Sequence, residues 1–133
     1  MAKNRCMLCG EQASEHKVKE VPFTYKGQSV MINQPGKWCD ACGEGVLTHE
    51  DRKTTLKEMQ AHKAKVDGLL TPDEIQKIRT MLKLSQKKAG EIFGGGVNAF
   101  SRYERGENPI PKPLNGLLTI LSNHPSQLKE LQR

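Results

Sequence analysis

Four cysteines constrain this chain more than any other feature of its sequence. They form two pairs, each with two residues between the thiols, and 29 residues separate the pairs: Cys6, Cys9, Cys39 and Cys42. This spacing lets both sulfurs of a pair face one tetrahedral site, and two such pairs supply four thiolates. A glycine follows each pair, at Gly10 and Gly43, and suits a tight turn there. The spacing predicts one structural zinc ion per chain, with no ligand position left for a catalytic water.

Other uses of the cysteines stay open at this point. A rubredoxin-like iron site uses the same four thiolates, and reduced cysteines can also be buried as small apolar side chains. Disulfides form in oxidising compartments, but the N-terminus has no apolar signal segment and the chain has no run of 18 apolar residues. We therefore expect a soluble, cytoplasmic protein with no membrane contact, in which disulfides are disfavoured.

The chain has few apolar residues for its length. Of its 133 residues, 35% are hydrophobic and only 5% are aromatic, so small domains of this composition need a metal or another staple to be stable. A charged helical stretch ends at Asp67-Gly68, and a new apolar pattern begins after it. We therefore predict two domains, a zinc-binding domain of residues 1–67 and a second domain of residues 68–133.

Most of the basic charge lies in the second predicted domain. Residues 1–67 carry 11 basic against 9 acidic side chains, or +2, and residues 68–133 carry 10 against 6, or +4. Four thiolates and one divalent cation would reduce the first value to zero. A basic surplus in the second domain permits a polyanionic partner but does not establish one.

The segment between the cysteine pairs has the pattern of a β-hairpin or small antiparallel sheet. Apolar and polar residues alternate up to Tyr25, Lys26-Gly27 can form a turn, and an apolar run at residues 30–32 ends before Pro35-Gly36. Pro22 predicts an edge position for the first strand, because proline cannot donate to the strand ladder.

Two roles are open for the aromatic residues of this segment. Phe23, Tyr25 and Trp38 can cover the zinc site and form a small core. Alternatively, the edge strand that carries Phe23 and Tyr25 pairs with the sheet of another protein.

A helix is expected from Thr48 to Asp67. Thr48 and Asp51 have the spacing of an N-cap and its partner, and a thin apolar stripe follows at helical intervals. We predict a connecting helix with one face on the zinc module and a hinge at Gly68.

Residues 68–133 have the pattern of five short helices. Thr71, Pro72 and Glu74 form a helix-start signal, and Ser85 begins a second helix, QKKAGEIF. A triple glycine precedes the third helix, VNAFSRYE, and leucine-rich segments predict the fourth and fifth. A short helix, a tight turn and another short helix in the middle of the domain are typical of the helix-turn-helix motif.

The third helix separates its residues onto two faces. Val97, Phe100 and Tyr103 are predicted to face the core, while Asn98 and Arg102, four residues apart, share an outward face with Ser101 beside them. Asn pairs bidentately with adenine and Arg with guanine in the major groove. The pattern therefore predicts Asn98 and Arg102 as base-contacting residues.

Weaker signals accompany this assignment. Gln86 and Lys87 lie at the start of the second helix, where a helix N-terminus can meet a DNA phosphate. Ser101 of the third helix is a further candidate for a phosphate contact. A plain helical hairpin with solvated polar residues is the open alternative. A nucleotide-binding loop is disfavoured, because no Gly-Lys-Ser/Thr follows the triple glycine.

The run SQKKAGEIFGGGVNAFSRYERGENP, residues 85–109, resembles the helix-turn-helix of the MqsA (YgiT-type) antitoxins. The two cysteine pairs resemble the zinc domain of the same family, and the order of the parts agrees over nearly the whole chain. The resemblance implies a mainly α fold with a small α+β zinc-binding module and a C-terminal five-helix domain of the XRE-type helix-turn-helix class.

The resemblance also implies a function without enzymatic activity. It implies that the zinc domain binds and neutralises a RelE-like, mRNA-cleaving toxin. The C-terminal domain would form a homodimer and bind double-stranded DNA at a palindromic operator, repressing its own operon. The resemblance places base contacts at Asn98 and Arg102 and zinc ligands at the four cysteines. It also implies weaker phosphate contacts at Lys26 and Lys63. The alternatives are a zinc-ribbon/helix-turn-helix transcriptional regulator without a toxin partner, and an iron-containing electron-transfer protein.

Overall fold

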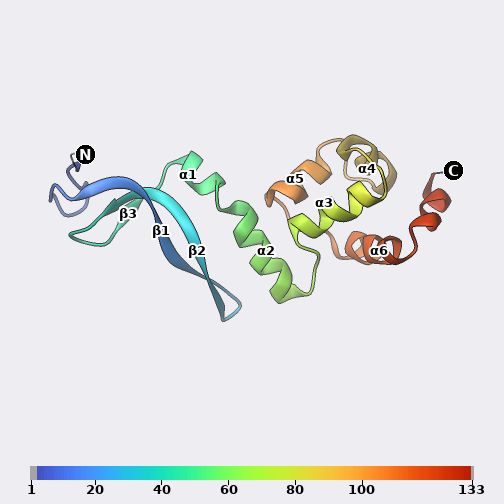
Figure 1. Cartoon of the computed structure of the whole chain (residues 1–133), viewed down its shortest axis with the longest axis horizontal. Helices are drawn as coiled ribbons and strands as arrows, with labels where there is room; N and C mark the ends of the chain where they lie inside the picture. The colour runs from blue at the N-terminus through green and yellow to red at the C-terminus, as the bar shows by residue number, and fades with distance from the viewer. Residues whose placement is uncertain (1–2, 133) are drawn as a thin grey trace. The chain divides into compact units, whose positions relative to one another are not determined.

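The computed structural model describes residues 3–132, and these divide into two compact units between Leu56 and Lys57 (Figure 1). The N-terminal unit contains the sheet and the cysteines, and the C-terminal unit contains most of the helices. The division falls before the helix that ends at Asp67, whereas the sequence pattern placed it after that helix. In the described residues, no helix combines the length and apolar content that crossing a bilayer requires.

The N-terminal unit is built on a long antiparallel hairpin. Strands β1 (Ser14–Tyr25) and β2 (Gln28–Cys39) pair along their whole length, and the short β3 (Gly45–Val46) pairs with the end of β2. Lys26 and Gly27 form the loop with φ of 49° and 79°. A two-residue turn with positive φ at both positions matches the twist of the strands. The hairpin and its turn are therefore confirmed, and β1 is an edge strand as Pro22 indicated.

The second strand is longer than the sequence suggested. Pro35 and Gly36 were expected to follow the strand, but they lie within it and pair with Val18 and Lys17. Pro35 is tolerated because β3 pairs only with residues 37 and 38 of β2, so no further strand needs its missing N–H. A Cβ at Gly36 would lie 2.4 Å from the Leu47 side chain, so that side chain would have to shift to admit any larger residue.

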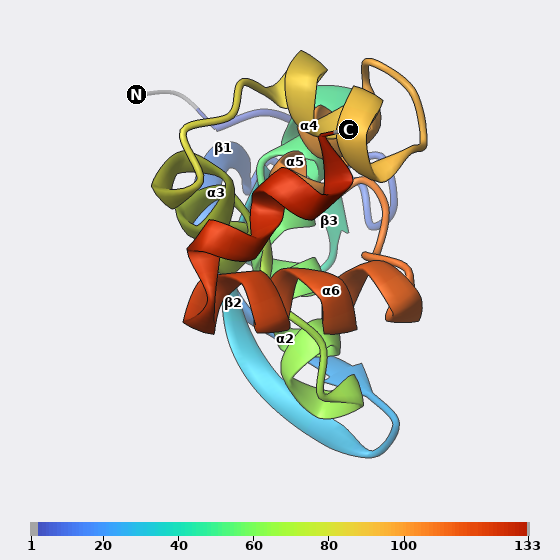
Figure 2. The ribbon, with the colours of Figure 1, turned by 90° about the vertical axis from the view of Figure 1, so that its right-hand side faces the viewer.

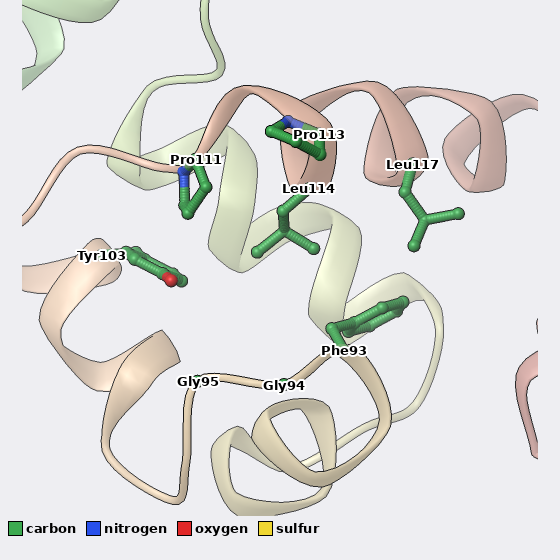
Figure 3. A pocket seen from close by; sticks show the side chains of 8 residues that line it. All are labelled: Phe93, Gly94, Gly95, Tyr103, Pro111, Pro113, Leu114 and Leu117. Carbon is green, nitrogen blue, oxygen red and sulfur yellow. The ribbon is translucent and has the colours of Figure 1, made fainter.

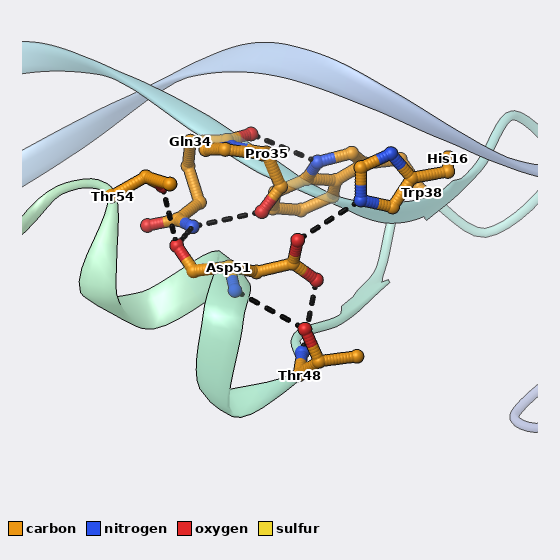
Figure 4. Close-up of polar contacts among 7 residues, drawn as sticks. All are labelled: His16, Gln34, Pro35, Trp38, Thr48, Asp51 and Thr54. Atoms are coloured by element: carbon orange, nitrogen blue, oxygen red, sulfur yellow. Dashed lines mark hydrogen bonds and ion pairs between the residues drawn. The ribbon is translucent and has the colours of Figure 1, made fainter.

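Most buried side chains of the N-terminal unit are polar or are cysteines, and Figure 4 shows the polar contacts around Gln34 and Asp51. The side-chain amide of the buried Gln34 donates to the backbone carbonyl of Asp51 at 2.9 Å and accepts from the Thr55 hydroxyl at 3.0 Å. The carboxylate of Asp51 is 2.9 Å from His16 Nε2. Trp38 is half-buried and donates its indole N–H to the Gln34 carbonyl. The expected aromatic core is therefore only partial, and hydrogen bonds hold this layer together.

The expected single helix after Thr48 is two helices, α1 (His49–Lys53) and α2 (Leu56–Asp67). The predicted cap is confirmed, because the Thr48 hydroxyl accepts from the Asp51 N–H and the Asp51 carboxylate accepts from the Thr48 N–H. The break occurs at two threonines. The Thr54 hydroxyl donates to the Asp51 carbonyl and the Thr55 hydroxyl to the Arg52 carbonyl, which favours a turn over a continuous helix.

The C-terminal unit contains the five short helices that the sequence predicted. They are α3 (Pro72–Met81), α4 (Gln86–Phe93), α5 (Ala99–Arg105), α6 (Lys112–Asn123) and a final 3-10 helix, η1 (Pro125–Leu131). The Thr71–Glu74 capping box and the Ser85 cap form as predicted. Helices α3 and α4 pack on α5, and α6 packs on α3 and η1 (Figure 2).

One apolar core holds these helices together. Its largest fully buried side chain is Phe100 of α5, and Leu118 of α6 is equally inaccessible. The buried members come from every helix of the unit except α2: Ile75, Ile78, Leu82, Leu84, Ala89, Ala99, Phe100, Tyr103, Ile110, Leu118, Leu121 and Leu128. This core fixes the position of α5, the helix with the predicted base-contacting residues.

Candidate functional site

The four cysteine sulfurs lie in one cluster at the end of the sheet. All four Sγ atoms are within 4.8 Å of one another, and Cys6–Cys42 and Cys9–Cys39 are each 3.7 Å apart. A tetrahedron with Zn–S bonds of about 2.3 Å places its sulfurs about 3.8 Å apart, whereas a disulfide would bring two of them to about 2.05 Å. The geometry therefore fits a metal ion with four thiolate ligands.

Backbone turns shape each half of the cluster. Gly10 donates its N–H to the Cys6 carbonyl at 3.0 Å, and Gly43 donates to the Cys39 carbonyl at 2.9 Å. Both glycines have φ near 80°, in the left-handed region. The Leu8 N–H lies 3.3 Å from Cys6 Sγ. The two halves therefore form matching knuckles whose sulfurs face one centre.

The protonation of the sulfurs is uneven. Backbone N–H groups of Cys9 and Leu8 lower the pKa of Cys6 to about 6. At Cys9, the Glu11 N–H lowers the pKa, but burial and the Cys39 sulfur outweigh it and raise the pKa to about 12. A bound cation would favour the thiolate form of all four sulfurs, so metal binding would be coupled to the release of protons.

The turn between α4 and α5 consists of three glycines, each with φ between 90° and 94°. Residues with a side chain rarely adopt this backbone conformation, which explains the run of Gly94, Gly95 and Gly96. The turn also passes very close to α4, because a Cβ at Gly90 would lie 2.1 Å from the Gly96 carbonyl oxygen. The glycines therefore allow a compact connection that sets α5 against α4.

Helix α5 begins later than its sequence pattern suggested. It starts at Ala99 with Asn98 as its N-cap residue, so Val97 precedes the helix and is 53% exposed. The prediction that Val97 faces the core was wrong, because the positive-φ glycine turn runs up to it and leaves it outside the helical register. Phe100 and Tyr103 are buried as predicted.

The predicted base-contacting residues lie together at the start of α5. The Arg102 N–H donates to the Asn98 carbonyl at 3.1 Å, so the two residues are one helical turn apart. Both side chains are exposed, and the Asn98 amide makes no capping hydrogen bond. Ser101 beside them is half-buried. The exposed amide and guanidinium are available to a ligand outside the helix.

The residues predicted for phosphate contact are more scattered. Lys87 is exposed near the N-terminus of α4, Lys63 is half-buried on α2, and Lys26 lies at the hairpin tip with its ammonium 5.3 Å from the Tyr25 ring centre. Gln86 is half-buried and donates to Glu104 Oε1 at 3.2 Å. The structure therefore brings Gln86 into a network with the far end of α5.

A buried ion pair in this network was missed from the sequence. Arg79 of α3 donates from Nε and Nη2 to the two oxygens of Glu104, at 2.8 and 2.9 Å, and from Nη1 to the Leu84 carbonyl at 2.8 Å. The Glu104 side chain is only 6% exposed. One signal was available, since Glu104 is four residues after Phe100 and so lies on the core side of α5.

Comparison with known proteins agrees with the sequence resemblance. The family model described as the antitoxin component of bacterial toxin-antitoxin system, MqsA, matches residues 4–132. The chain belongs to the MqsA antitoxin family. It is 36% identical over 131 residues to Antitoxin MqsA of Escherichia coli (strain K12), an alignment that covers 96% of this chain and 99% of the relative.

Membership of the MqsA family confirms the resemblance and applies to both the cysteine cluster and α5. Both lie in the part of the chain that the family model matches. The family supports a role as the antitoxin component of a toxin-antitoxin system, a role based on binding. Two chemically distinct surfaces of this MqsA-family chain are therefore candidates for its partners: the hairpin beside the cysteine cluster and the exposed start of α5.

Proposed function

We propose that this protein is the antitoxin of a type II toxin-antitoxin system and acts in the cytoplasm by binding, without catalysis. In this proposal, the N-terminal domain binds and neutralises a RelE-like, mRNA-cleaving toxin. The C-terminal domain represses its own operon as a sequence-specific DNA-binding homodimer. The proposal is supported by the match to the MqsA family along nearly the whole chain.

The proposed metal is one structural Zn²⁺ per chain, held by Cys6, Cys9, Cys39 and Cys42. Four thiolates at tetrahedral spacing are typical of structural zinc and leave no position for a reacting water. The ion would connect the start of the chain to the end of β2, because one ligand pair precedes β1 and the other begins at Cys39, the last residue of β2.

The single observation that carries the DNA-binding half is the position of Asn98 and Arg102. They lie one turn apart on the exposed side of a short helix whose opposite side is anchored in the core by Phe100 and Tyr103. In a helix-turn-helix, residues near the N-terminus of the second helix contact base edges in the major groove. We assign α4 and α5 to that motif, in the XRE-type arrangement, with Asn98 facing adenine and Arg102 facing guanine.

Phosphate contacts would orient this helix on the duplex. Lys87 and the Ser101 hydroxyl are the candidates nearest the motif, and Lys26 and Lys63 are the more distant ones. Gln86 gives one amide hydrogen to Glu104 and retains a second N–H that can donate to a phosphate. Its main contribution in this proposal is to connect the start of α4 with α5.

A two-fold dimer would present two α5 helices to successive major grooves. Part of the leucine-rich segment from Leu114 to Leu131 is unsuited to the dimer surface, because Leu118 and Leu121 belong to the core. Helix α6 offers a different strip. Ile120 is 53% exposed, and no neighbouring atom lies within 4 Å of a Cβ built at Gly116. We assign the dimer contact to this side of α6.

Substitution of the base-contacting residues tests the DNA assignment. We expect Arg102→Ala and Asn98→Ala each to weaken binding to a duplex from the protein's own promoter by about 1–3 kcal/mol, because each removes a bidentate base contact. Fluorescence anisotropy at fixed salt measures the affinity, and thermal unfolding shows that the fold is unchanged.

Arg105→Ala is the matched control for charge, since Arg105 is exposed on the same helix and pairs with Glu107. It should lower the affinity for promoter and scrambled duplexes equally. Wild-type affinity in either Arg102→Ala or Asn98→Ala would refute the assignment of α5 as the base-contacting helix.

A further inference from the structure

A pocket of about 320 Å³ lies within the C-terminal unit, between the glycine turn, α5 and the start of α6 (Figure 3). Phe93, Leu114 and Leu117 form apolar walls, and Pro111 and Pro113 border the α6 side. It lies away from the exposed Asn98 and Arg102 side chains, neither of which lines it. The proposed contact with DNA therefore does not use this pocket.

The floor of the pocket depends on the glycine turn. Gly94 and Gly95 line it, and both have φ values that side chains rarely adopt. A Cβ at Gly95 would lie 2.9 Å from the Ala99 side chain and 3.7 Å from the Tyr103 hydroxyl oxygen. The glycines thus keep space open directly beneath that hydroxyl.

Tyr103 supplies the only polar side chain among the pocket-lining residues, and Figure 3 shows its oxygen directed into the hollow. The residue is only 8% exposed, yet within the described part of the chain its hydroxyl has no hydrogen-bond partner. Among the described residues, every fully buried side-chain nitrogen or oxygen has a hydrogen-bond partner. Because the Tyr103 hydroxyl has none, it is not fully buried and faces the open space of the pocket. A tyrosine buried to this extent usually has a partner for its hydroxyl.

Water satisfies this hydroxyl poorly. An ordered internal water makes about three hydrogen bonds, but the prolines of the wall have no N–H, and the Gly94 N–H already donates to Gly90. The side chains of Phe93, Leu114 and Leu117 are hydrocarbon, so the backbone of the glycine turn supplies the other polar atoms. Displacement of a weakly held water is favourable when a ligand fills the apolar space and also forms a hydrogen bond with the hydroxyl.

Size and charge restrict what can bind. An engineered apolar cavity of about 150 Å³ holds one benzene ring, so this pocket has room for roughly two fused rings. Ligand sites commonly combine apolar walls with a few well-placed polar groups. None of the lining residues is acidic or basic, so a charged group would be desolvated without a counter-charge.

We propose that this pocket is a binding site for a neutral, largely apolar small molecule of about two-ring size with one hydrogen-bonding group, held by Tyr103. The proposal does not depend on DNA or toxin binding. It assigns to Tyr103 a polar role in addition to its packing against Phe100, whose ring centre is 5.5 Å away.

Two probes that differ by one hydroxyl test the proposal on the full-length, metal-bound protein. 2-Naphthol and naphthalene are titrated separately, and NMR shifts of the Gly94 and Gly95 amides report binding. We expect saturable shifts with both probes, and an affinity for 2-naphthol roughly 3- to 10-fold higher than for naphthalene, the value of one hydrogen bond.

The Tyr103→Phe variant keeps the ring and removes the hydroxyl. Its affinities for 2-naphthol and naphthalene should therefore be about equal, and naphthalene should bind as it does to the wild type. Leu114→Trp fills the pocket and should abolish binding of both probes, whereas Met81→Trp, an exposed position on α3, should leave binding unchanged. An equal preference in wild type and Tyr103→Phe would overturn the proposal. The absence of saturable shifts at Gly94 and Gly95 in the wild type, as when a second copy of the chain closes the pocket, would also overturn it.

Discussion

Removal of the metal is expected to unfold the N-terminal unit and to leave the C-terminal unit folded. Among the described residues of the N-terminal unit, Ile32 is the only buried apolar side chain besides Cys6 and Cys39, so hydrophobic burial contributes little to its stability. A structural Zn²⁺ contributes about 10–16 kcal/mol of apparent binding free energy at pH 7. That is comparable to the whole stability of an ordinary domain. The C-terminal unit has twelve buried core residues of its own.

The Cys39→Ser variant and chelation of the wild type should therefore give the same result. Metal analysis and a visible spectrum first establish whether the wild type contains one zinc per chain, since an iron site would be coloured. NMR then follows both units, and the hairpin signals should collapse while those of α3 to α6 persist. Met7→Ser is the matched control, because Met7 lies between two ligands but is 81% exposed, and it should retain the metal.

Two outcomes would contradict this expectation. Well-dispersed hairpin signals in the verified metal-free protein would show that the polar layer around Gln34 suffices without a metal. Loss of both sets of signals together would show that the two units do not fold independently.

Substitution of Glu104 is expected to destabilise the C-terminal unit strongly. Glu104→Ala leaves the guanidinium of Arg79 buried without its partner, since the Arg79 side chain is only 14% exposed. Breaking such a pair typically costs about 3–5 kcal/mol. The same change removes the acceptor for Gln86, so the connections of α5 to both α3 and α4 are weakened.

Urea unfolding of the C-terminal unit measures this effect. Glu107→Ala is the matched control, because Glu107 pairs with Arg105 at the exposed surface and should change stability by less than about 1 kcal/mol. The double variant Arg79→Leu/Glu104→Leu should recover part of the loss, since it leaves no unpaired charge. A Glu104→Ala protein within about 0.5 kcal/mol of the wild type would show that the ion pair does not stabilise the unit.

Features set by a few neighbouring residues were predictable from the sequence. The helix starts at Thr71 and Ser85 depend on side-chain oxygens that accept nearby N–H groups, and Lys26-Gly27 matches a two-residue turn. The cysteine cluster was predictable for a similar reason, because two residues between thiols fix each half of the site. Only the approach of the two cysteine pairs to each other depends on the folded structure.

Features decided by distant contacts were not predictable. Pro35 lies inside β2 because β3 is too short to reach it, a fact that no local pattern contains. The break at Thr54 and Thr55 depends partly on the hydrogen bond from Thr55 to Gln34, 21 residues away. At α5, the pattern gave the buried Phe100 and Tyr103 but not the buried Glu104, whose partner Arg79 lies on another helix.

The central claim is that this protein is an antitoxin whose metal-organised N-terminal domain neutralises a ribonuclease. The most direct measurement is mRNA cleavage by the small ribonuclease that this account expects beside its gene, with increasing amounts of this protein. We predict that cleavage stops at a stoichiometric ratio with the wild type and equally with Arg102→Ala, and continues with metal-free Cys39→Ser. The absence of such a ribonuclease, or cleavage that continues with excess wild-type protein, would contradict the antitoxin account and leave a DNA-binding regulator without a toxin.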